Sequence, residues 1–167
     1  MIKRIFFLIS LLVLVISCSG FEFVYNAPIL DKIKEKTLFS ISGDNKSVIN
    51  SYVLNKLGKA GSDPVYVLYI VSDGSIEAVV IESDATASKF MIKHDLKYKL
   101  NIISKKCTVF EKKILTENLY DAKSAGYSFG TDLAEKELST KNLHSNIDQF
   151  ISDLSINFDY LECENEG

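Results

Sequence analysis

Residues 90–102 read "FMIKHDLKYKLNI" and carry the strongest hydrophobic pattern in the chain. Apolar side chains recur at every second position, with His94 in the same register, in Phe90, Ile92, Leu96, Tyr98, Leu100 and Ile102. The opposite register holds Lys93, Lys97, Lys99 and Asn101, continued upstream by Lys89. Because side chains alternate between the two faces of a β-strand, this pattern predicts a strand with one buried face and one solvated face.

A second strand is predicted directly downstream. Ser104-Lys105-Lys106 favours a turn, after which the chain continues as "CTVFEKKILTENLYDA" (107–122). The apolar positions Phe110 and Ile114 indicate an antiparallel partner for the first strand. Their alternation is imperfect, which is typical of a β-bulge.

Two further extended segments are predicted upstream. The continuous β-branched and aromatic run "VYVLYIVS" (65–72) is typical of a buried central strand. Asp73-Gly74 suggests a tight turn, followed by the extended segment "IEAVVIES" (76–83). Near the start of the folded region, "TLFSIS" (37–42) predicts another strand.

Helical spacing appears in two places. Gly43-Asp44-Asn45 provides turn and N-cap chemistry before a helix that Gly58 and Gly61 close, with apolar positions Val48, Ile49, Tyr52, Val53 and Leu57. Thr131 or Asp132 is the expected cap of a long helix whose apolar stripe comprises Leu143, Ile147, Phe150, Ile151, Leu154 and Phe158. Two helices and a mostly antiparallel sheet predict an α+β fold, a two-layer sandwich that buries both stripes.

The amino terminus has the shape of a secretory signal. Lys3 and Arg4 precede an apolar run from Ile5 to Ile16, interrupted only by Ser10. This run is shorter than the roughly 20 residues that a helix needs to cross a bilayer. The run ends in "VISC" (15–18), which resembles a bacterial lipobox. We therefore predict that residues 1–17 are a lipoprotein-type signal peptide and that Cys18 is lipidated.

Composition limits the domain count and the class of partner. Removal of residues 1–17 leaves 150 of the 167 residues, which is enough for one domain with a real core. The formal charge changes from −3 to −5 (−3 − 2), because Lys3 and Arg4 leave with the signal. This acidic balance argues against nucleic acid as a partner. The predicted organisation is a lipid anchor and tether (18–36), in which Pro28 opposes a helix, a single α+β domain (37–160) and an acidic tail (161–167).

Cys107 and Cys163 remain after lipidation of Cys18. A compartment outside the cytoplasm would permit a disulfide that ties the tail to a hairpin turn, but unpaired thiols fit the sequence equally well. Their spacing matches no metal or redox motif, and we predict neither a metal nor a cofactor.

Enzymatic chemistry is not indicated. The chain has two histidines, His94 and His144, and the first shares the inward register of a strand. There is no Gly-x-Ser-x-Gly, phosphate-loop or His-Glu-x-x-His motif. Asp84 suits a turn or the start of a strand, and Glu135 and Glu137 lie in a mixed-charge helical segment typical of a solvated face. We therefore expect a protein that is not an enzyme.

Three stretches resemble a known family. "CSGFEFVY" (18–25) has Gly20, Phe21 and Tyr25 in common with it but inserts Ser19 and carries Phe23 where proline is usual. "TASKF" (86–90), followed by "YKL" (98–100), and the aromatic-rich start of the last helix in "YSFGTDLAEKELSTKNLHSNIDQFISDL" (127–154) are the other two. In this order they resemble the LPS-assembly lipoproteins of Gram-negative outer membranes, the LptE-like (RlpB) family.

This resemblance implies both a fold and a function. The implied fold has two helices packed on one side of a four-stranded sheet. The implied protein is lipid-anchored at the periplasmic side of the outer membrane. Ser19, the residue after the anchor, also agrees with export to that membrane. Its implied role is to insert as a plug and assembly partner into the LPS-translocating β-barrel (LptD-like) in lipopolysaccharide transport to the cell surface.

The basic strand face is the candidate ligand site. Lys89, Lys93, Lys97 and Lys99, extended by Lys105 and Lys106, would present ammonium groups to the phosphates of lipopolysaccharide. Lysines on the outer face of a half-buried sheet are also commonly just solvated or protect a strand edge.

Another function also fits the sequence. The chain could be an envelope lipoprotein that binds another lipid or serves another transporter. A plug needs a broad polar and aromatic surface that fits a lumen, whereas a lipid carrier needs a deep apolar pocket. Tyr120, Tyr127 and Phe129 would suit an interface or would fasten the last helix to the sheet.

Overall fold

The computed structural model describes residues 28–85, 87–121, 128–157 and 163. Along these segments the elements are α2 (Pro28–Ile33), β1 (Thr37–Gly43), α3 (Lys46–Leu57), β2 (Tyr66–Ile81), β3 (Ala87–Ile102), β4 (Cys107–Asp121) and α4 (Ser128–Asn157). The predicted signal peptide, Cys18, Tyr127 and Phe158 lie outside the described residues, as does the acidic tail apart from Cys163. No helix in the described part of the chain is long and apolar enough to cross a membrane.

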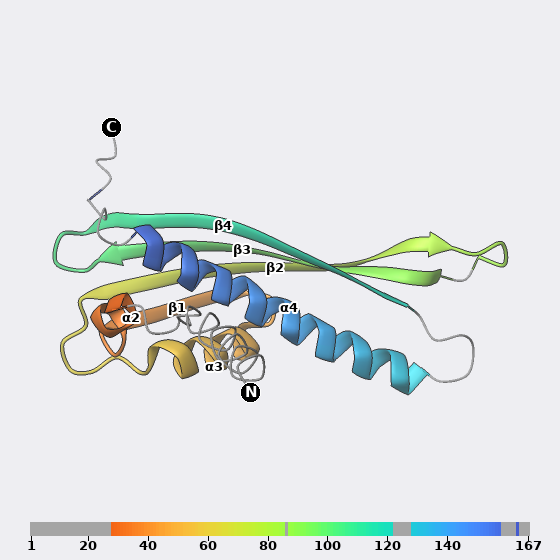
Figure 1. Ribbon diagram of the computed structural model, residues 1–167, viewed down its shortest axis with the longest axis horizontal. Helices are drawn as coiled ribbons and strands as arrows, with labels where there is room; N and C mark the ends of the chain where they lie inside the picture. The colour runs from red at the N-terminus through yellow and green to blue at the C-terminus, as the bar shows by residue number, and fades with distance from the viewer. Residues whose placement is uncertain (1–27, 86, 122–127, 158–162, 164–167) are drawn as a thin grey trace, which may run out of the picture.

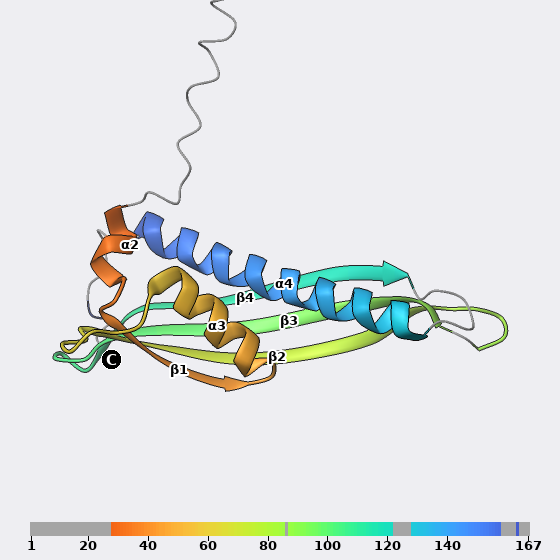
Figure 2. The same cartoon turned by 90° about the horizontal axis from the view of Figure 1, so that it is seen from below.

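The strands form one mixed sheet in the order β1-β2-β3-β4. β1 runs parallel to β2, and the other neighbouring strands are antiparallel. The described helices all lie on one face of this sheet (Figure 1, Figure 2). The predicted α+β two-layer sandwich with a mostly antiparallel four-stranded sheet is confirmed.

The alternating pattern of β3 behaves as predicted. Its apolar positions from Ile92 to Leu100 are buried together with His94, while Lys97 on the other face is exposed. The bulge predicted in β4 is found beside Val109, where the register with β3 shifts between Leu100 and Asn101. β3 therefore supplies the buried ladder against which the helices pack.

β2 corrects two predictions. It lies in the interior of the sheet, but only one face is buried, and Tyr69 and Val71 are 41% and 49% exposed on the other. Helices cover a single face of the sheet, so an apolar run here does not imply burial on both sides. The turn predicted at Asp73-Gly74 is also wrong, because β2 stays paired with β3 through both residues and ends at Ile81.

Gly74 has a packing role inside β2. A Cβ at this position would lie 3.1 Å from Nδ1 of His94, which faces it across the β2–β3 pair. The backbone N–H of Gly74 donates to the carboxylate of Asp44, 3.1 Å away.

Asn45, the residue before α3, adopts a left-handed conformation and its side chain makes no capping hydrogen bond. The turn predicted at Gly43-Asp44-Asn45 is therefore present, but it lacks the predicted side-chain cap. Gly58 ends the helix as expected.

The remaining helix boundaries differ from the sequence predictions. Pro28 begins α2, which is compatible with its fixed φ because the first turn of a helix does not need its N–H. α2 lies within the range predicted as tether, yet Ile33 is buried in the core. α4 begins at Ser128, so Thr131 and Asp132 lie inside its first turns instead of capping it.

The molecule has two halves along its long axis. The core half comprises residues 28–72, 96–114 and 143–157 and holds the entire hydrophobic cluster, including Tyr98, stacked on Phe150 with ring centroids 4.1 Å apart. The ribbon half comprises residues 73–85, 87–95, 115–121 and 128–142. Among its described residues, Ile92 is the one hydrophobic side chain that is buried.

Two asparagines of α4 join the halves. Asn146 donates to the carbonyl oxygen of Ile114 at 2.9 Å and accepts from the hydroxyl of Tyr98 at 2.7 Å. Asn142 donates to the carbonyl oxygen of Thr116 at 3.2 Å. Both side chains are buried, so these bonds replace water for polar groups where the apolar core ends.

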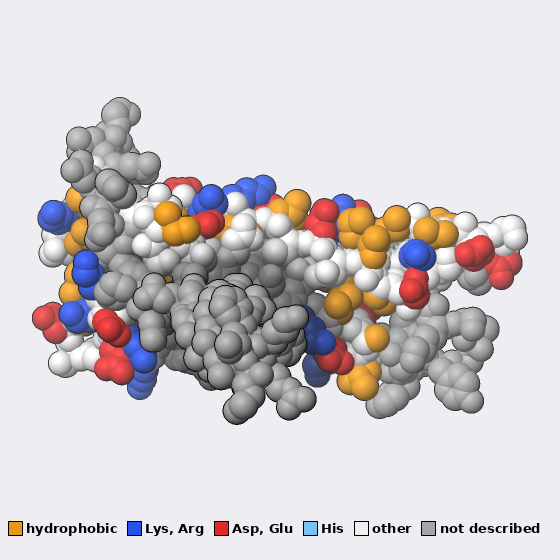
Figure 3. All heavy atoms as spheres, viewed as in Figure 1, with side chains coloured by type: hydrophobic (Ala, Val, Ile, Leu, Met, Phe, Trp, Pro, Cys, Tyr) orange, Lys and Arg blue, Asp and Glu red, His pale blue; other side chains and the backbone are white. Residues whose placement is uncertain are grey.

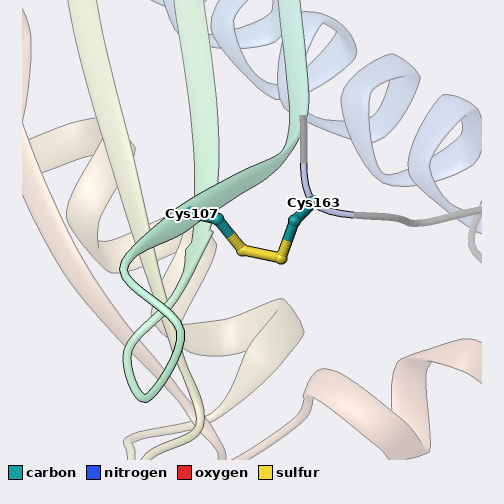
Figure 4. The surroundings of a disulfide bond; sticks show 2 residues. All are labelled: Cys107 and Cys163. Atoms are coloured by element: carbon teal, nitrogen blue, oxygen red, sulfur yellow. A yellow bond between two sulfur atoms is a disulfide. The ribbon is translucent and has the colours of Figure 1, made fainter. Parts of the chain in front are cut away.

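The sequence left the state of two cysteines open, and the structure pairs them. Cys107, at the start of β4, forms a disulfide with Cys163, beyond the end of α4, with the Cα atoms 5.5 Å apart (Figure 4). The bond links the carboxyl-terminal region to the end of the core half. A cross-link of this kind stabilises chiefly by restricting the unfolded chain.

Candidate functional site

The sheet face that no described helix covers is a candidate surface that spans four strands, and we call it the open face. The strand register places apolar side chains on it from all four strands: Leu38 of β1, Val67, Tyr69 and Val71 of β2, Met91 of β3, and Leu115 and Leu119 of β4. Leu38 is 45% exposed and Leu115 is 55% exposed. Alternation in β3 predicted a solvated face, but the apolar contribution of β1, β2 and β4 was not foreseen.

The four lysines proposed as a ligand site do lie on the open face of β3, but they are not equivalent. Lys93 pairs with Glu77 at 2.8 Å and approaches Glu117 at 3.9 Å. This partnership raises the pKa of Lys93 and lowers the pKa of Glu77. Lys89 pairs with Asp121 at 3.5 Å. Two of the lysines therefore already have carboxylate partners.

Lys97 and Lys99 differ from this pair, because neither forms an ion pair with another described residue. Lys97 lies opposite Lys113 in the β3–β4 register, and Lys113 is itself bound to Asp95 at 2.8 Å. Lys99 lies opposite Tyr69 on β2 and opposite Glu111 on β4, with which it forms no ion pair. The centre of the open face thus holds the cations best suited to an anionic group. Lys105 and Lys106 are exposed in the turn between β3 and β4.

The two histidines do not form a catalytic pair. His94 is buried on the helix-covered face, with Nε2 2.9 Å from Oγ of Ser139. His144 is stacked on Tyr52, with ring centroids 3.7 Å apart. Asp84 is exposed in the loop after β2. No cluster of potential metal ligands is found among the described residues.

Tyr120 fastens α4 to the sheet. Its hydroxyl donates to a carboxylate oxygen of Glu135 at 2.7 Å. Burial and this neighbouring carboxylate raise the pKa of Tyr120. Glu135 is therefore part of a helix–sheet contact instead of a solvated face, whereas Glu137 pairs along the helix with Lys141 at 3.0 Å. Of Phe129, in the first turn of α4, only the backbone is described.

Hydrophobic side chains are also exposed over the ribbon half (Figure 3). They include Ile76, Val79, Val80 and Ile81 of β2, together with Leu119 and Leu133. β1 pairs with β2 only as far as Ser72, so β2 beyond this point has a strand partner on one side only. The sequence pattern predicted an extended segment here and gave no sign that it stands outside the core.

Comparison with known proteins establishes the fold. No protein-family model and no curated protein matches the chain. A candidate lipoprotein from Caulobacter crescentus CB15 has a similar structure, with a TM-score of 0.59 and 14% identity over 80% of this chain and 97% of that one. Rare lipoprotein B from Shewanella oneidensis matches with a TM-score of 0.52 and 14% identity, covering 74% of this chain and 98% of its own.

A minor lipoprotein from Acinetobacter baumannii gives a TM-score of 0.52 at 12% identity, over 80% of this chain and 98% of that one. The similarity spans nearly the full length of each of these proteins. The chain therefore has the α+β fold found in these bacterial lipoproteins.

Proposed function

We propose that the chain is an LptE-like outer-membrane lipoprotein that acts as plug and assembly partner of the LPS-translocating β-barrel. Three observations support this proposal. The fold is similar to that of rare lipoprotein B. The amino terminus carries a lipobox-like segment ending in Cys18, and three stretches of the sequence resemble the LptE-like family.

The composition of the open face is the main structural support for this proposal. This face spans four strands and mixes apolar side chains from every strand with charged ones from β2, β3 and β4. A protein in the lumen of a barrel needs a broad polar and aromatic surface, because the interior of an outer-membrane barrel is polar. The charged side chains of β3 and the ring of Tyr69 on the open face are suited to such a wall. The proposed role requires non-covalent contacts with the barrel and no covalent chemistry.

Lipopolysaccharide carries phosphates, for which ammonium groups are suitable partners. Lys97 and Lys99 would meet such groups without first giving up a carboxylate partner. Lys89 and Lys93 would have to exchange Asp121 and Glu77 for the phosphate. We therefore place a lipopolysaccharide contact at Lys97 and Lys99.

Co-purification tests the barrel partner. The full chain with a carboxyl-terminal affinity tag is isolated in detergent from native membranes, and the associated proteins are identified by mass spectrometry. We expect a near-stoichiometric large outer-membrane barrel. With a Tyr69→Glu, Val71→Glu double variant of the open face, the amount of co-purified barrel should fall at least tenfold. Ile156→Glu, on an exposed position of α4, is the control and should retain the barrel.

Absence of a barrel from the unmodified protein would contradict the proposal. A bound lipid in its place would favour the envelope lipoprotein that carries another lipid. Retention of the barrel by the Tyr69→Glu, Val71→Glu variant would place the contact on another surface.

Two further measurements test the anchor and the lysines. Radiolabelled palmitate should enter the unmodified protein and not Cys18→Ala, because the thiol is the proposed acylation site. Lipopolysaccharide binding should fall more for Lys97→Ala, Lys99→Ala than for Lys89→Ala, Lys93→Ala, although both double variants remove two positive charges. Equal effects would show that the ion pairs do not distinguish the two pairs of lysines.

A further inference from the structure

A cleft opens in the ribbon half between α4, the β2–β3 pair and the turn before α3. Its volume is about 560 Å³, within the range of small-molecule sites. Its walls include Asp44 from the turn, Gly74 and Ile76 from β2, Ile92 and His94 from β3, and Glu135 from α4. The cleft lies on the helix-covered side of the sheet and is therefore separate from the open face.

His94 is the unusual member of this cleft. Its side chain is 3% exposed, and Nε2 contacts Oγ of Ser139 at 2.9 Å. Nδ1 has no hydrogen-bond partner among the described residues. A buried polar atom without a partner lowers stability, so a histidine used only for packing would be expected to have both nitrogens paired.

Nδ1 is a buried atom, and Gly74, which has no side chain, lies beside it. A Cβ on this residue would lie 3.1 Å from Nδ1 and 3.3 Å from Cε1 of His94. Any side chain at position 74 would therefore fill the approach to the unpaired nitrogen. Gly74 also lines the cleft.

The charge of the cleft favours a cation. Asp44 and Glu135 contribute carboxylates, and Lys136 contributes the one ammonium group among the lining residues. The surrounding ribbon half holds ten Asp and Glu against four Lys, a formal charge of −6 (4 − 10). Burial lowers the pKa of His94, against a smaller opposing effect of Asp44, so the imidazole is neutral at pH 7.5.

The hydrogen-bonding pattern agrees with the charge. When Nε2–H of His94 donates to Ser139, Nδ1 carries a lone pair and accepts. The cleft then presents one imidazole acceptor and two carboxylates beside the aliphatic side chains of Ile76 and Ile92. A ligand that complements this wall has N–H donors, a positive charge and a short apolar part.

We propose that this cleft binds a small organic cation, a primary ammonium compound whose N–H groups meet His94 Nδ1 and the carboxylates of Asp44 and Glu135. Its carbon chain packs on Ile76 and Ile92. This site is independent of the barrel partner and of the lysines of the open face.

Histidine NMR tests the site in the full chain purified in a non-ionic detergent. The imidazole ¹⁵N signals are followed while n-butylammonium chloride is added at pH 7.5. We expect a saturable shift of the His94 signals at probe concentrations of about 1–10 mM, as befits a ligand of about five non-hydrogen atoms. His144, which does not line the cleft, is an internal reference and should not shift.

Matched probes and variants define the chemistry. Butyrate and 1-butanol have the same carbon chain without the positive charge, and both should bind at least tenfold more weakly. Asp44→Asn keeps an acceptor for the Gly74 N–H but removes the charge, and it should weaken n-butylammonium binding severalfold. Asp63→Asn, an exposed position outside the cleft, is its control.

Gly74→Ala fills the approach to Nδ1 and should weaken binding at least tenfold. Gly61→Ala is the matched control, because its Cβ would lie 3.6 Å from the nearest atom, an ordinary contact. No saturable shift of His94 below about 100 mM probe, or equal shifts with the cation, the alcohol and the carboxylate, would overturn the proposal. Should Gly74→Ala fail to fold, the Asp44→Asn comparison decides the question.

Discussion

The two halves of α4 contact the same sheet through different chemistry. In the core half, Leu143, Ile147 and Phe150 are buried in the hydrophobic cluster. In the ribbon half, Glu135 and Ser139 reach the sheet through hydrogen bonds to Tyr120 and His94. Apolar burial stabilises in proportion to the area removed from water, whereas a hydrogen bond to protein replaces one to water and contributes little net. One helix thus packs through apolar side chains at one end and through polar contacts with the sheet at the other.

The strands show the same division. β2 is paired on both sides in the core half, but beyond Ser72 it pairs only with β3. The register is irregular between Ala78 and Ile81, as is common at sheet edges. The exposed apolar side chains between Ile76 and Ile81 and most of the cleft beside His94 therefore lie where β2 is an edge strand.

Truncation of an aromatic ring gives the largest expected effect. Phe150→Ala removes the ring stacked on Tyr98 and should lower the free energy of unfolding by about 3–5 kcal/mol. Ile76→Ala, at a half-exposed position of the ribbon half, should lower it by less than about 1 kcal/mol. Denaturant unfolding of the two variants measures both values. Similar losses would show that the ribbon half is as important for stability as the core half.

Loss of the disulfide should be the next largest effect. The Cys107→Ser, Cys163→Ser double variant should lower the free energy of unfolding by about 2–4 kcal/mol. Without the disulfide, the unfolded chain regains the conformational freedom that loop closure had removed. Thermal unfolding with and without a reducing agent measures this. The reducing agent should destabilise the unmodified protein and leave the double variant unchanged. A thiol count of two in the unfolded, unreduced mature protein would contradict the bond.

Asn146 tests the boundary between the halves. Asn146→Ala leaves the hydroxyl of Tyr98 and the carbonyl oxygen of Ile114 without their partner, and should lower the free energy of unfolding by about 1–3 kcal/mol. Asn157→Ala, which loses one exposed hydrogen bond to Asp153, is the matched control and should change it by less than about 0.5 kcal/mol. Equal values would mean that water replaces the Asn146 side chain.

The smallest effect is expected from pH. Burial lowers the pKa of His94 below its usual 6.5, so the unfolded state takes up a proton more readily than the folded state. Stability is therefore complete above about pH 6.5 and falls as the pH decreases towards the folded pKa. Asp44 from the turn before α3 opposes the shift, and the charged groups of α4 that line the same cleft are Glu135 and Lys136.

Unfolding curves between about pH 7.5 and 5 measure this dependence, above the range in which carboxylates titrate. His94→Gln should remove most of it. His144→Gln should remove less, since His144 is only half-buried beside Tyr52 although burial lowers its pKa as well. A pH dependence that persists unchanged in His94→Gln would assign it to other groups.

The sequence pattern predicted particular elements well where the signal is local. The alternation from Phe90 to Ile102 placed each side chain of β3 on its correct face, and Val53 and Leu57 are buried at the helical spacing expected of α3. The same reasoning failed at Asp73-Gly74, where residue types common in turns lie inside a strand. Glycine is present there because of His94, which is distant in sequence and adjacent in space.

Amino-acid order alone specified the class of fold, the inward register of β3, the apolar stripe of α4 and the lipobox-like segment before Cys18. These features follow from the periods of strands and helices and from short motifs, which are properties of neighbouring residues. The pairing of Cys107 with Cys163, the open face beside Tyr69 and Val71, and the cleft around His94 required the tertiary structure. Each depends on which layer covers which face, and residues from several elements settle that together.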